Sequence, residues 1–451
     1  MIVREAKLLN GSKSQYARLD DAIRTAQFIR NKAVRLWRDE RDVDKSRISR
    51  LCKELAKEFP FANKLNSMAR QASVERAWNS ISSFYRRSLG QHSLSCKLRS
   101  RRKPPSREFA LAPAGGAGSD RCREGASIKG YPQFKKHCRS VEYKTTGWKL
   151  SDDCKSMNFT DGFKAGEFSL FCNSDVRKDL FTLKINRVRV VRRADGYYAQ
   201  FCFNANRSEP GNYTGKVVGL DLGLNYFYKD TNDNAAIYPK YLRSSEKRIK
   251  KLQRRLSSKF VKGKKPQSKN YQKARIRLGK AHLKVQRQRK DWAVKLARCV
   301  VTSNDVVVYE DLKIQNMVKN HHLAKSISDA GWYQFTQWLD YFGKVWDKAV
   351  ISVSPNFTSA DCSNCGFRVK KSLSTRTHKC PKCQTEICRD TNAALNILKK
   401  GMSILGAEYN STEGHSETAS FEETLGETST SVNEETSDLI SGVDEPRISN
   451  S

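Results

Sequence analysis

Two short runs of β-branched residues, each ending in an acidic residue, limit the folds open to this chain more than any other feature. Residues 217–221 read VVGLD and residues 306–310 read VVVYE. Apolar runs of this length, bounded by turn residues, predict strands that are buried in a sheet. A third acidic residue, Asp390, opens a segment whose apolar residues have the spacing of a helix.

The three acidic residues predict a site for divalent metals. Asp221 and Glu310 would lie at strand ends and Asp390 at the start of a helix. Carboxylates gathered in this way can hold two cations about 3.5–4 Å apart, the arrangement that drives in-line attack on a phosphodiester. A lone acid at a strand end is more often a turn former. Asp311 adjoins Glu310, and only one of the two can face a metal, because neighbours in a strand point to opposite faces.

The order of the elements around these acids predicts an RNase H-like mixed sheet. The strand of Asp221 is followed by a helical hairpin, the strand of Glu310, a helix, a cysteine-rich insertion and the helix of Asp390. In such a fold the chemistry gathers at one edge of the sheet.

Two C-x-x-C pairs predict a structural metal site. The four cysteines, with fourteen residues between the pairs, are Cys362, Cys365, Cys380 and Cys383. Four thiolates suit one tetrahedral zinc, as in a zinc ribbon, and they leave no open position for catalysis. Redox-active thiol pairs are the alternative, and His378 and Cys388 are nearby residues that could replace a ligand. Because Asp390 follows Cys383 by seven residues, we expect the ribbon to brace the third carboxylate.

The charge of the chain favours a polyanionic partner. The 451 residues carry a net charge of +37, and the last 51 hold eleven acids against one arginine, so residues 1–400 carry +47. Charge of this size releases many counterions on binding nucleic acid, which we favour over an acidic membrane surface. The chain has no run of 18 apolar residues and its N-terminus lacks the apolar core of a signal peptide. We therefore expect no membrane partner. The nine further cysteines have no paired spacing and fit reduced thiols, so we expect a cytoplasmic protein that associates with the nucleoid by binding DNA.

The N-terminal half is expected to combine helices with a small β-barrel. The apolar spacing of a helix recurs in residues 15–39, 48–59 and 74–85. Short strand patterns follow from about 131 to 214, with hairpin signals at Asp161-Gly162 and Asp195-Gly196. We expect the strand at the N-terminus to return to this barrel. The arginines of KINRVRVVRR form either a phosphate-contacting sheet face or an ordinary solvated one.

The segment 240–302 predicts a strongly basic helical hairpin, broken by KGKKPQS. The residues expected on its packed side are Ile249, Leu252, Leu256, Ile276, Leu283, Trp292, Leu296 and Val300. Few acids stand at four-residue spacing from its lysines and arginines, which favours contact with a phosphate backbone over a plain solvated face. Further on, we expect a helix from Gly331, a short strand over 349–353 and, beyond residue 402, a disordered acidic tail.

Several motifs together resemble TnpB, the transposon-encoded RNA-guided DNA endonuclease of the OrfB family. They are VVGLDLGLN, DVVVYEDLKIQNMVKN, LAKSISDAGW, SPNFTSADCSNCG and CRDTNAALNILKKG, in this order between residues 216 and 401. GYPQFKKHCRSVEYKTTGWKLS and FTDGFKAGEF in the β-rich region also look like TnpB, whereas the helical N-terminal region matches only by pattern. The resemblance implies a multidomain α+β protein: an RNase H-like (RuvC) α/β domain with an inserted zinc ribbon, a wedge β-barrel and a helical recognition lobe.

The resemblance and the composition together give expected boundaries. They are 1–12 for the first strand of the wedge β-barrel, 13–98 for the helical recognition lobe, 99–130 for a linker, 131–215 for the rest of the barrel, 216–356 for the RuvC nuclease with its basic hairpin at 240–302, 357–387 for the zinc ribbon, 388–402 for the last RuvC segment and 403–451 for the acidic tail.

The resemblance also implies an activity, cofactors and partners. Asp221, Glu310 and Asp390 become the RuvC triad, which holds two catalytic magnesium ions, and the four paired cysteines hold one structural zinc ion. A monomer would bind one guide RNA transcribed from the transposon end and cut a double-stranded DNA target beside a short flanking motif. Guide pairing would read the target, while the protein would read the flanking motif and the shape of the heteroduplex.

Three other functions are compatible with parts of this pattern. A compact type V CRISPR effector shares the RuvC and ribbon motifs and differs in the source of its guide. An RNA-guided DNA-binding repressor would bind without cutting, but the presence of all three carboxylates disfavours it. A DDE-type transposase would join strands without RNA, and the RuvC motifs argue against it.

Overall fold

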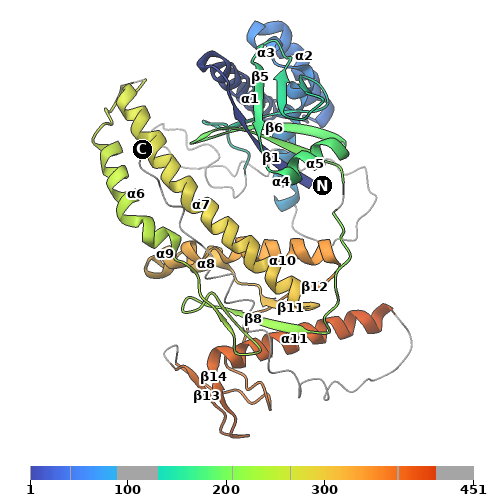
Figure 1. Cartoon of the computed structure of the whole chain (residues 1–451), viewed down its shortest axis with the longest axis vertical. Coiled ribbons are helices and arrows are strands. Elements are labelled where there is room, and N and C mark those ends of the chain that lie inside the picture. The colour runs from blue at the N-terminus through green and yellow to red at the C-terminus, as the bar shows by residue number, and fades with distance from the viewer. Residues whose placement is uncertain are drawn as a thin grey trace, which may run out of the picture.

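The two larger β-sheets lie toward opposite ends of an elongated molecule, and two long helices, α6 and α7, run between them (Figure 1). The computed structural model describes residues 2–40, 42–88, 131–205, 207–264, 266–372 and 375–412. The expected linker at 99–130 and the acidic tail from residue 413 onward lie outside these ranges.

The first sheet has seven antiparallel strands in the order β2-β6-β7-β1-β5-β4-β3. The strands are β1 (Ile2–Leu9), β2 (Ser140–Tyr143), β3 (Trp148–Leu150), β4 (Ser156–Phe159), β5 (Gly166–Phe171), β6 (Ile185–Arg193) and β7 (Gly196–Phe203). The N-terminal strand β1 pairs with both β5 and β7. Between the described residues of edge strands β2 and β3 there is no ladder pairing, so the strands expected to form a barrel make a hydrogen-bonded sheet that is not closed.

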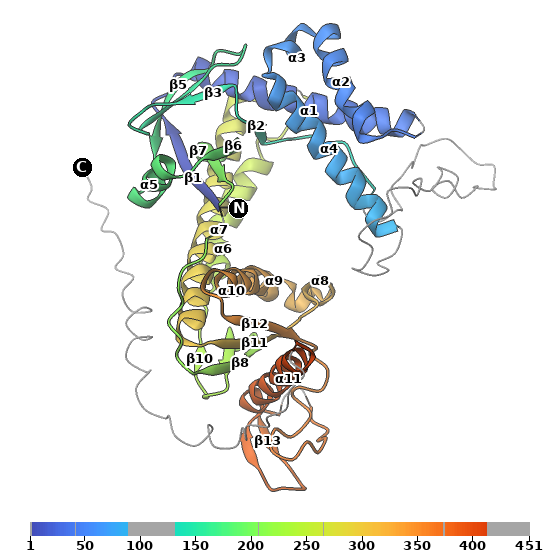
Figure 2. The ribbon, with the colours of Figure 1, turned by 90° about the vertical axis from the view of Figure 1, so that its right-hand side faces the viewer.

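Helices beside this sheet close its hydrophobic core (Figure 2). They are α1 (Lys13–Asp39), α2 (Lys45–Glu58), α3 (Pro60–Lys64), α4 (Ser67–Ser88) and α5 (Ser174–Thr182). The three helices predicted from apolar spacing are confirmed as α1, α2 and α4. Helices α3 and α5 were not predicted from the sequence, because five and nine residues are too short for a clear helical period.

The arginines of β6 are engaged in ion pairs. Arg187 and Arg189 both contact Glu142 on β2, at 2.8 and 2.7 Å, and Arg192 contacts Asp20 on α1 at 2.9 Å. Burial alone would raise the pKa of Glu142, but the two arginines outweigh it and lower the pKa. The arginines of this strand are partly exposed and are paired with acids of other elements, so the strand is a solvated face whose charge is largely paired and not a free phosphate-contacting face.

The second sheet is mixed, with the order β10-β9-β8-β11-β12. Its strands are β8 (Val217–Leu222), β9 (Tyr228–Asp230), β10 (Ala235–Ala236), β11 (Val306–Glu310) and β12 (Ala349–Val353). Strand β11 is parallel to both β8 and β12, while β9 and β10 are antiparallel to their neighbours. The strands predicted at 217–221, 306–310 and 349–353 are therefore confirmed.

Helices cover both faces of the mixed sheet. The C-terminal part of α7 (Lys269–Ser303) and α10 (Trp332–Trp346) share a core with one face, and α11 (Arg389–Thr412) packs on the other. Two short helices, α8 (Ile314–Met317) and α9 (His321–Ala330), precede α10. The approach of α11 is close enough to require glycine, because a Cβ on Gly219 of β8 would lie 2.3 Å from the Ala394 carbonyl oxygen.

The predicted basic hairpin is confirmed as α6 (Tyr241–Ser257) and α7. One residue expected on its packed side is exposed: Ile276 has 47% of its surface accessible. It lies two residues from the half-buried Leu278, which is about 200° around a helix, so it faces away from the packed stripe. At the other sheet, Arg287 of α7 contacts Asp195 at 2.8 Å and the Tyr198 hydroxyl at 2.6 Å.

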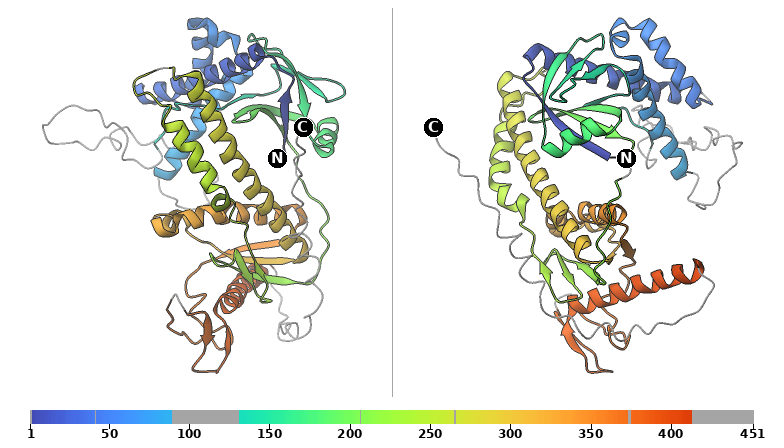
Figure 3. Two further views of the ribbon diagram at one scale, coloured as in Figure 1. Left: turned by 60° about the vertical axis from the view of Figure 1, so that its left-hand side comes forward. Right: turned by 45° about the vertical axis from the view of Figure 1, so that its right-hand side comes forward.

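The C-terminal helix corrects one boundary. The acidic tail was expected to be disordered from residue 403, but α11 continues to Thr412 (Figure 3). The start of α11 and Met402 pack against the mixed sheet. The backbone hydrogen bonds from residue i to residue i−4 then continue the helix beyond these packed residues. The segment between β12 and α11 contains the two-stranded sheet of β13 (Thr377–Lys379) and β14 (Glu386–Cys388).

Candidate functional site

Strand alternation brings Asp221 and Glu310 to the same face of the mixed sheet. In β8, Val218, Leu220 and Leu222 belong to the core shared with α7 and α10, so Asp221 points to the opposite face. In β11, Val308 packs against α11, and Glu310, two residues later, lies on that same face.

The neighbouring acid, Asp311, has a different environment. Glu310 is 7% exposed at the end of β11, whereas Asp311 follows the strand and is exposed. The ambiguity between these two residues in the sequence is therefore resolved by burial in favour of Glu310 as the acid beside α11.

The β9–β10 hairpin holds the start of α11 beside β8. Lys229 of β9, which lies opposite Asp221 in the sheet, contacts Asp233 at 2.8 Å and donates to the Cys388 sulfur at 3.3 Å. The Thr391 hydroxyl donates to Asp233. These contacts fix the first turn of α11, in which Asp390 lies.

Glu310 and Asp390 are close enough to Asp221 to shift its ionisation. Burial is the main cause that raises the pKa of Asp221 well above its ordinary value, and Glu310 and Asp390 raise it further. Burial also raises the pKa of Glu310. The side chain of Asp390 is 19% exposed, and its carboxylate lies 3.4 Å from the Arg389 guanidinium.

Two side chains from outside the sheet hold Glu310. The Thr358 hydroxyl donates to Glu310 Oε1 at 2.5 Å in a buried hydrogen bond, and this bond lowers the glutamate pKa against the larger effect of burial. The Asn396 amide of α11 in turn donates to the Thr358 carbonyl at 2.8 Å. Glu310 is thus positioned by a chain of bonds that runs from α11 through the segment before the cysteine cluster.

This set of acids fits divalent cations. Hard cations such as Mg²⁺ prefer carboxylate oxygens, and a cation would relieve the repulsion that raises the Asp221 pKa. Neither Asp221 nor Glu310 forms an ion pair with a lysine or arginine of the described ranges. The acids are spread more widely than the ligands of a single small ion, because the four-cysteine cluster is the one group in the described structure whose ligand atoms all lie within 4.8 Å of one another.

The four predicted zinc ligands come together. The Sγ atoms of Cys362 and Cys383 are 3.6 Å apart, and those of Cys365 and Cys380 are 3.5 Å apart. Sulfurs bound tetrahedrally to zinc at about 2.3 Å would be separated by about 3.8 Å. The donor set and its spacing therefore fit one structural zinc.

A tight turn follows the first C-x-x-C pair, and the two other candidate ligands nearby lie outside the cluster. Gly366 has a φ of +74° and donates its N–H to the Cys362 carbonyl at 2.9 Å, as expected for the turn after a C-x-x-C pair. His378 is fully buried against Lys371, and Cys388 is held by Lys229. Neither belongs to the metal cluster.

Asparagines of α11 tie the cluster to the carboxylate site. Asn392 accepts from the Ser363 N–H at 2.9 Å and donates to the Asp361 carbonyl at 2.8 Å. Asn396, one turn later, donates to both Thr358 and Asp361. Both asparagines are buried, so the cysteine cluster and Glu310 share one supporting element.

Sequence reasoning did not assign these supporting residues. Thr358 lies in SPNFTSADCSNCG, and Asn392 and Asn396 lie in CRDTNAALNIL. Two asparagines four residues apart on an otherwise apolar helix face are an available signal, because buried amides need partners. Their partners lie more than 25 positions away, which no local pattern indicates.

The exposed face of the α6–α7 hairpin is rich in cations without acidic partners. The exposed cations of the hairpin that form no ion pair within the described ranges include Lys247, Arg248, Lys251, Arg254, Arg255, Lys273, Arg275, Arg277, Lys280 and Lys284. Its acids, Glu246 and Asp291, pair with Lys250 and Lys295. Such a surface suits a phosphate backbone. None of the described helices has the length and apolar character needed to cross a bilayer.

Two protein-family models match adjacent parts of the chain. The OrfB_IS605 model, described as a probable transposase, matches residues 200–321, and the Cas12f1-like TNB domain matches residues 332–397. The first match contains Asp221, Glu310 and the hairpin, and the second contains Asp390 and all four clustered cysteines.

Known proteins resemble the same region. A putative RNA-guided DNA endonuclease of Streptomyces pristinaespiralis is 34% identical over 196 residues, which cover 43% of this chain and 47% of that protein. A TnpB-like protein, L79, of Acanthamoeba polyphaga mimivirus is 30% identical over 141 residues, covering 30% of this chain and 27% of that protein. The alignments thus span about half and about a quarter of these relatives. A Cas12f1–sgRNA–target DNA complex aligns over 85% of this chain and 82% of its own, with 15% identity and a TM-score of 0.49. The two matched segments, residues 200–321 and 332–397, thus resemble proteins of the OrfB/TnpB family.

Proposed function

We propose that this protein is an RNA-guided DNA endonuclease of a transposon, which cuts target DNA beside a short flanking motif. The observation that carries the proposal is the gathering of Asp221, Glu310 and Asp390 beside α11, with enough mutual influence to raise the Asp221 pKa. The relative from Streptomyces pristinaespiralis, described as a putative RNA-guided DNA endonuclease, supports the same activity.

In this proposal Asp221, Glu310 and Asp390 hold two magnesium ions at a RuvC-type site. Bound there, the metals would activate a water molecule and stabilise the leaving oxygen of an in-line displacement. The protein's own part is to orient the carboxylates: Thr358 holds Glu310, and the β9–β10 hairpin holds the helix turn of Asp390. The zinc in the four-cysteine cluster has a structural role.

The remaining parts of the chain are proposed to bind RNA and DNA. We assign residues 216–356 and 388–402 to the nuclease and 357–387 to its zinc ribbon. Residues 1–12 and 131–215 form the wedge, and 13–98 the recognition lobe. The α6–α7 hairpin, which carries exposed cations without an ion-pair partner in the described ranges, runs between the two ends of the molecule (Figures 1 and 2), where an extended duplex could contact both. One monomer would hold one guide RNA.

The deciding experiment supplies the purified chain with guides that do or do not match a DNA target carrying a library of flanking sequences. We expect magnesium-dependent cutting of the matched target beside one short motif, and none by the Asp221→Ala variant. Guided binding without cutting under any divalent metal would leave the repressor function instead. Cutting without RNA, or equal cutting of both targets, would overturn guided recognition. A guide encoded in a CRISPR array, rather than at the transposon end, would favour the type V effector.

A further inference from the structure

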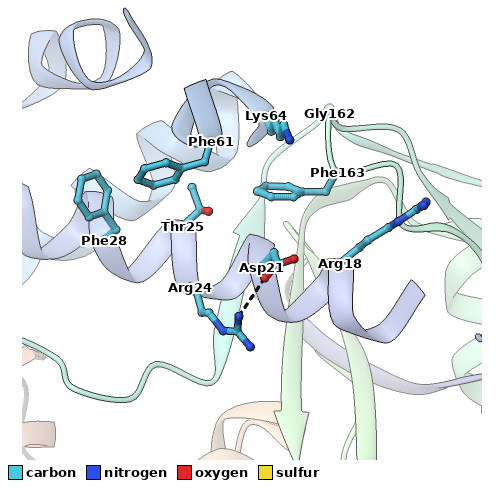
Figure 4. Close-up of a pocket in the computed structure, with 9 residues that line it drawn as sticks. All are labelled: Arg18, Asp21, Arg24, Thr25, Phe28, Phe61, Lys64, Gly162 and Phe163. Atoms are coloured by element: carbon cyan, nitrogen blue, oxygen red, sulfur yellow. Dashed lines mark hydrogen bonds and ion pairs between the residues drawn. The ribbon is translucent and has the colours of Figure 1, made fainter. Parts of the chain in front are cut away.

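A cavity lies far from the carboxylates, between α1, α3 and the β4–β5 loop (Figure 4). Its volume is about 560 Å³, and its lining includes three phenylalanines, Phe28, Phe61 and Phe163. Each phenylalanine comes from a different one of these three segments, and none belongs to the four-cysteine or carboxylate sites. Cavities for small ligands are typically about 300–1,000 Å³.

The aromatic rings remain accessible. Phe28 and Phe163 are half-buried, and Phe61 is 42% exposed. The rings of Phe28 and Phe61 meet edge to face, with centroids 5.1 Å apart. Figure 4 shows the three rings in a row, with the Thr25 side chain beneath them. Phe28 and Phe163 thus pack against the hydrophobic core and also line the cavity.

Backbone contacts hold the walls of the cavity together. The Gly162 N–H of the β4–β5 loop donates to the Lys64 carbonyl of α3 at 2.8 Å. A Cβ on Gly162 would lie 2.8 Å from the Lys64 backbone, so only glycine permits this approach. The Arg18 guanidinium of α1 donates to the Lys164 carbonyl in the same loop. The cavity is therefore built before any ligand arrives.

Cations surround the rings. Arg18, Lys64 and Lys164 are exposed, and none has an acidic partner in the described ranges. Lys64 and Arg18 flank the Phe163 ring (Figure 4). The one acid in the lining, Asp21, pairs with Arg24 at 3.1 Å. The electrostatic character of the cavity is thus positive.

We propose that this cavity binds one unpaired nucleotide of a nucleic-acid strand, with its base against the phenylalanine rings and its phosphate near Lys64 and Arg18. Every base offers a π face that stacks on aromatic side chains, and cations beside the ring serve the backbone. A paired base would keep its faces against its neighbours in the helix, so the site requires a bulged, looped or terminal nucleotide. The inference rests on the proposed function only in taking nucleic acid as the partner, and it needs no cleavage.

The test uses photochemical cross-linking of the full chain to a short single-stranded oligouridine that carries one 5-iodouracil, and to its DNA counterpart. Mass spectrometry then maps the cross-linked peptides. We expect cross-links at Phe61 or Phe163 that survive competition by an abasic oligomer of the same length. Cross-linking by the RNA probe alone would assign the nucleotide to RNA, and by the DNA probe alone to DNA.

A variant pair separates stacking from general charge. Phe163→Ala should weaken binding at this site by about 5- to 150-fold, the range for losing one base–aromatic stack. Phe171→Ala is the matched control, because Phe171 is 68% exposed on β5 of the same sheet and outside the cavity. Cross-links confined to the α6–α7 hairpin, loss of the cavity cross-link to the abasic competitor, or equal effects of the two variants would overturn the proposal. Because the readout is a cross-link, its failure leaves guided cleavage untouched.

Discussion

Individual residues of the carboxylate site are buried at a cost in stability. Asp221 is enclosed with two other acids, and its raised pKa means that the ionised form is less favourable in the folded chain than in the unfolded chain. The free-energy cost is absent below the ordinary Asp pKa of about 3.9 and complete above the folded-state pKa.

Replacing this carboxylate should therefore stabilise the protein while removing its activity. We expect Asp221→Asn to raise the free energy of unfolding in metal-free neutral buffer, because an amide has no charge to bury beside Glu310 and Asp390. Chemical unfolding of both proteins measures the difference in their free energies of unfolding. This difference should become smaller as the pH falls toward 4. Asp311→Asn is the matched control, because Asp311 is exposed and should change stability little. A variant less stable than the natural chain would show that Asp221 is not electrostatically frustrated.

The Thr358 hydroxyl positions Glu310, which gives a second prediction. Thr358→Val keeps the shape but leaves a buried carboxylate without its donor, so we expect a loss of about 1–3 kcal/mol in stability. Manganese affinity, measured by electron paramagnetic resonance, should fall with it. Thr358→Ser retains the hydroxyl and should restore both quantities. Equal behaviour of the Val and Ser variants would remove Thr358 from the site.

At the scale of elements, α11 joins the metal cluster to the sheet. Its first turn carries Asp390, its buried asparagines hold the segment around Cys362, and Gly401 lies so close to β11 that a Cβ there would be 2.3 Å from Val308 Cγ2. A disturbance in the ribbon should therefore reach the carboxylates.

Loss of one zinc ligand tests this coupling. We expect Cys380→Ser to lower the zinc content from about one per chain and to destabilise the C-terminal half, because bound structural zinc contributes folding free energy. Metal analysis and thermal unfolding provide the measurements. Cys388→Ser is the control, since Cys388 lies outside the cluster and should keep the zinc. Zinc loss in the control alone would reassign the ligands.

The extent of α11 predicts the result of truncation. A chain ending at Thr412 keeps the whole helix and should unfold at the same temperature as the full chain. A chain ending at residue 402 loses the last helical turns beyond Gly401 and should unfold at a lower temperature. Ending the chain at Thr412 already removes ten of the eleven acids of the tail. Both truncated chains should therefore bind non-specific DNA more tightly than the full chain does. Equal unfolding temperatures for the two would show that the last turns do not stabilise the sheet.

At the scale of the whole molecule, α7 links the two sheets. Its C-terminal part packs on the mixed sheet, and Arg287 contacts the β6–β7 turn of the other sheet. The hairpin thus places exposed lysines and arginines between the two ends.

This arrangement predicts that RNA affinity falls steeply with salt. We expect the logarithm of the binding constant to fall linearly with the logarithm of salt concentration. Lys251→Gln should reduce the slope by roughly one unit, because it removes one cation that would neutralise a phosphate. Filter binding with a structured RNA probe measures the slope. Lys295→Gln is the control, because Lys295 already pairs with Asp291 at 3.0 Å. A slope near zero for the natural chain would contradict an extended phosphate-binding surface.

The sequence by itself determined the features that depend on local pattern. The C-x-x-C spacing places Cys362 and Cys365 at one turn. Runs of β-branched residues specify β8 and β11, and the helical spacing of apolar residues specifies the long helices. These signals are read within a few residues, because strand alternation, helical period and ligand spacing act over that range. The locations of Asp221 and Glu310 on their strands followed from the same patterns.

Only the tertiary structure decided which of these residues act together. The parallel register that sets Val217 opposite Val306 and Leu220 opposite Tyr309 brings the Asp221 and Glu310 faces together. The same non-local packing paired the β6 arginines with Glu142 and Asp20, and it placed Thr358 and Asn396 around Glu310. These partners lie tens of positions apart, so their contacts depend on strand order and helix docking, which no local period of the sequence encodes.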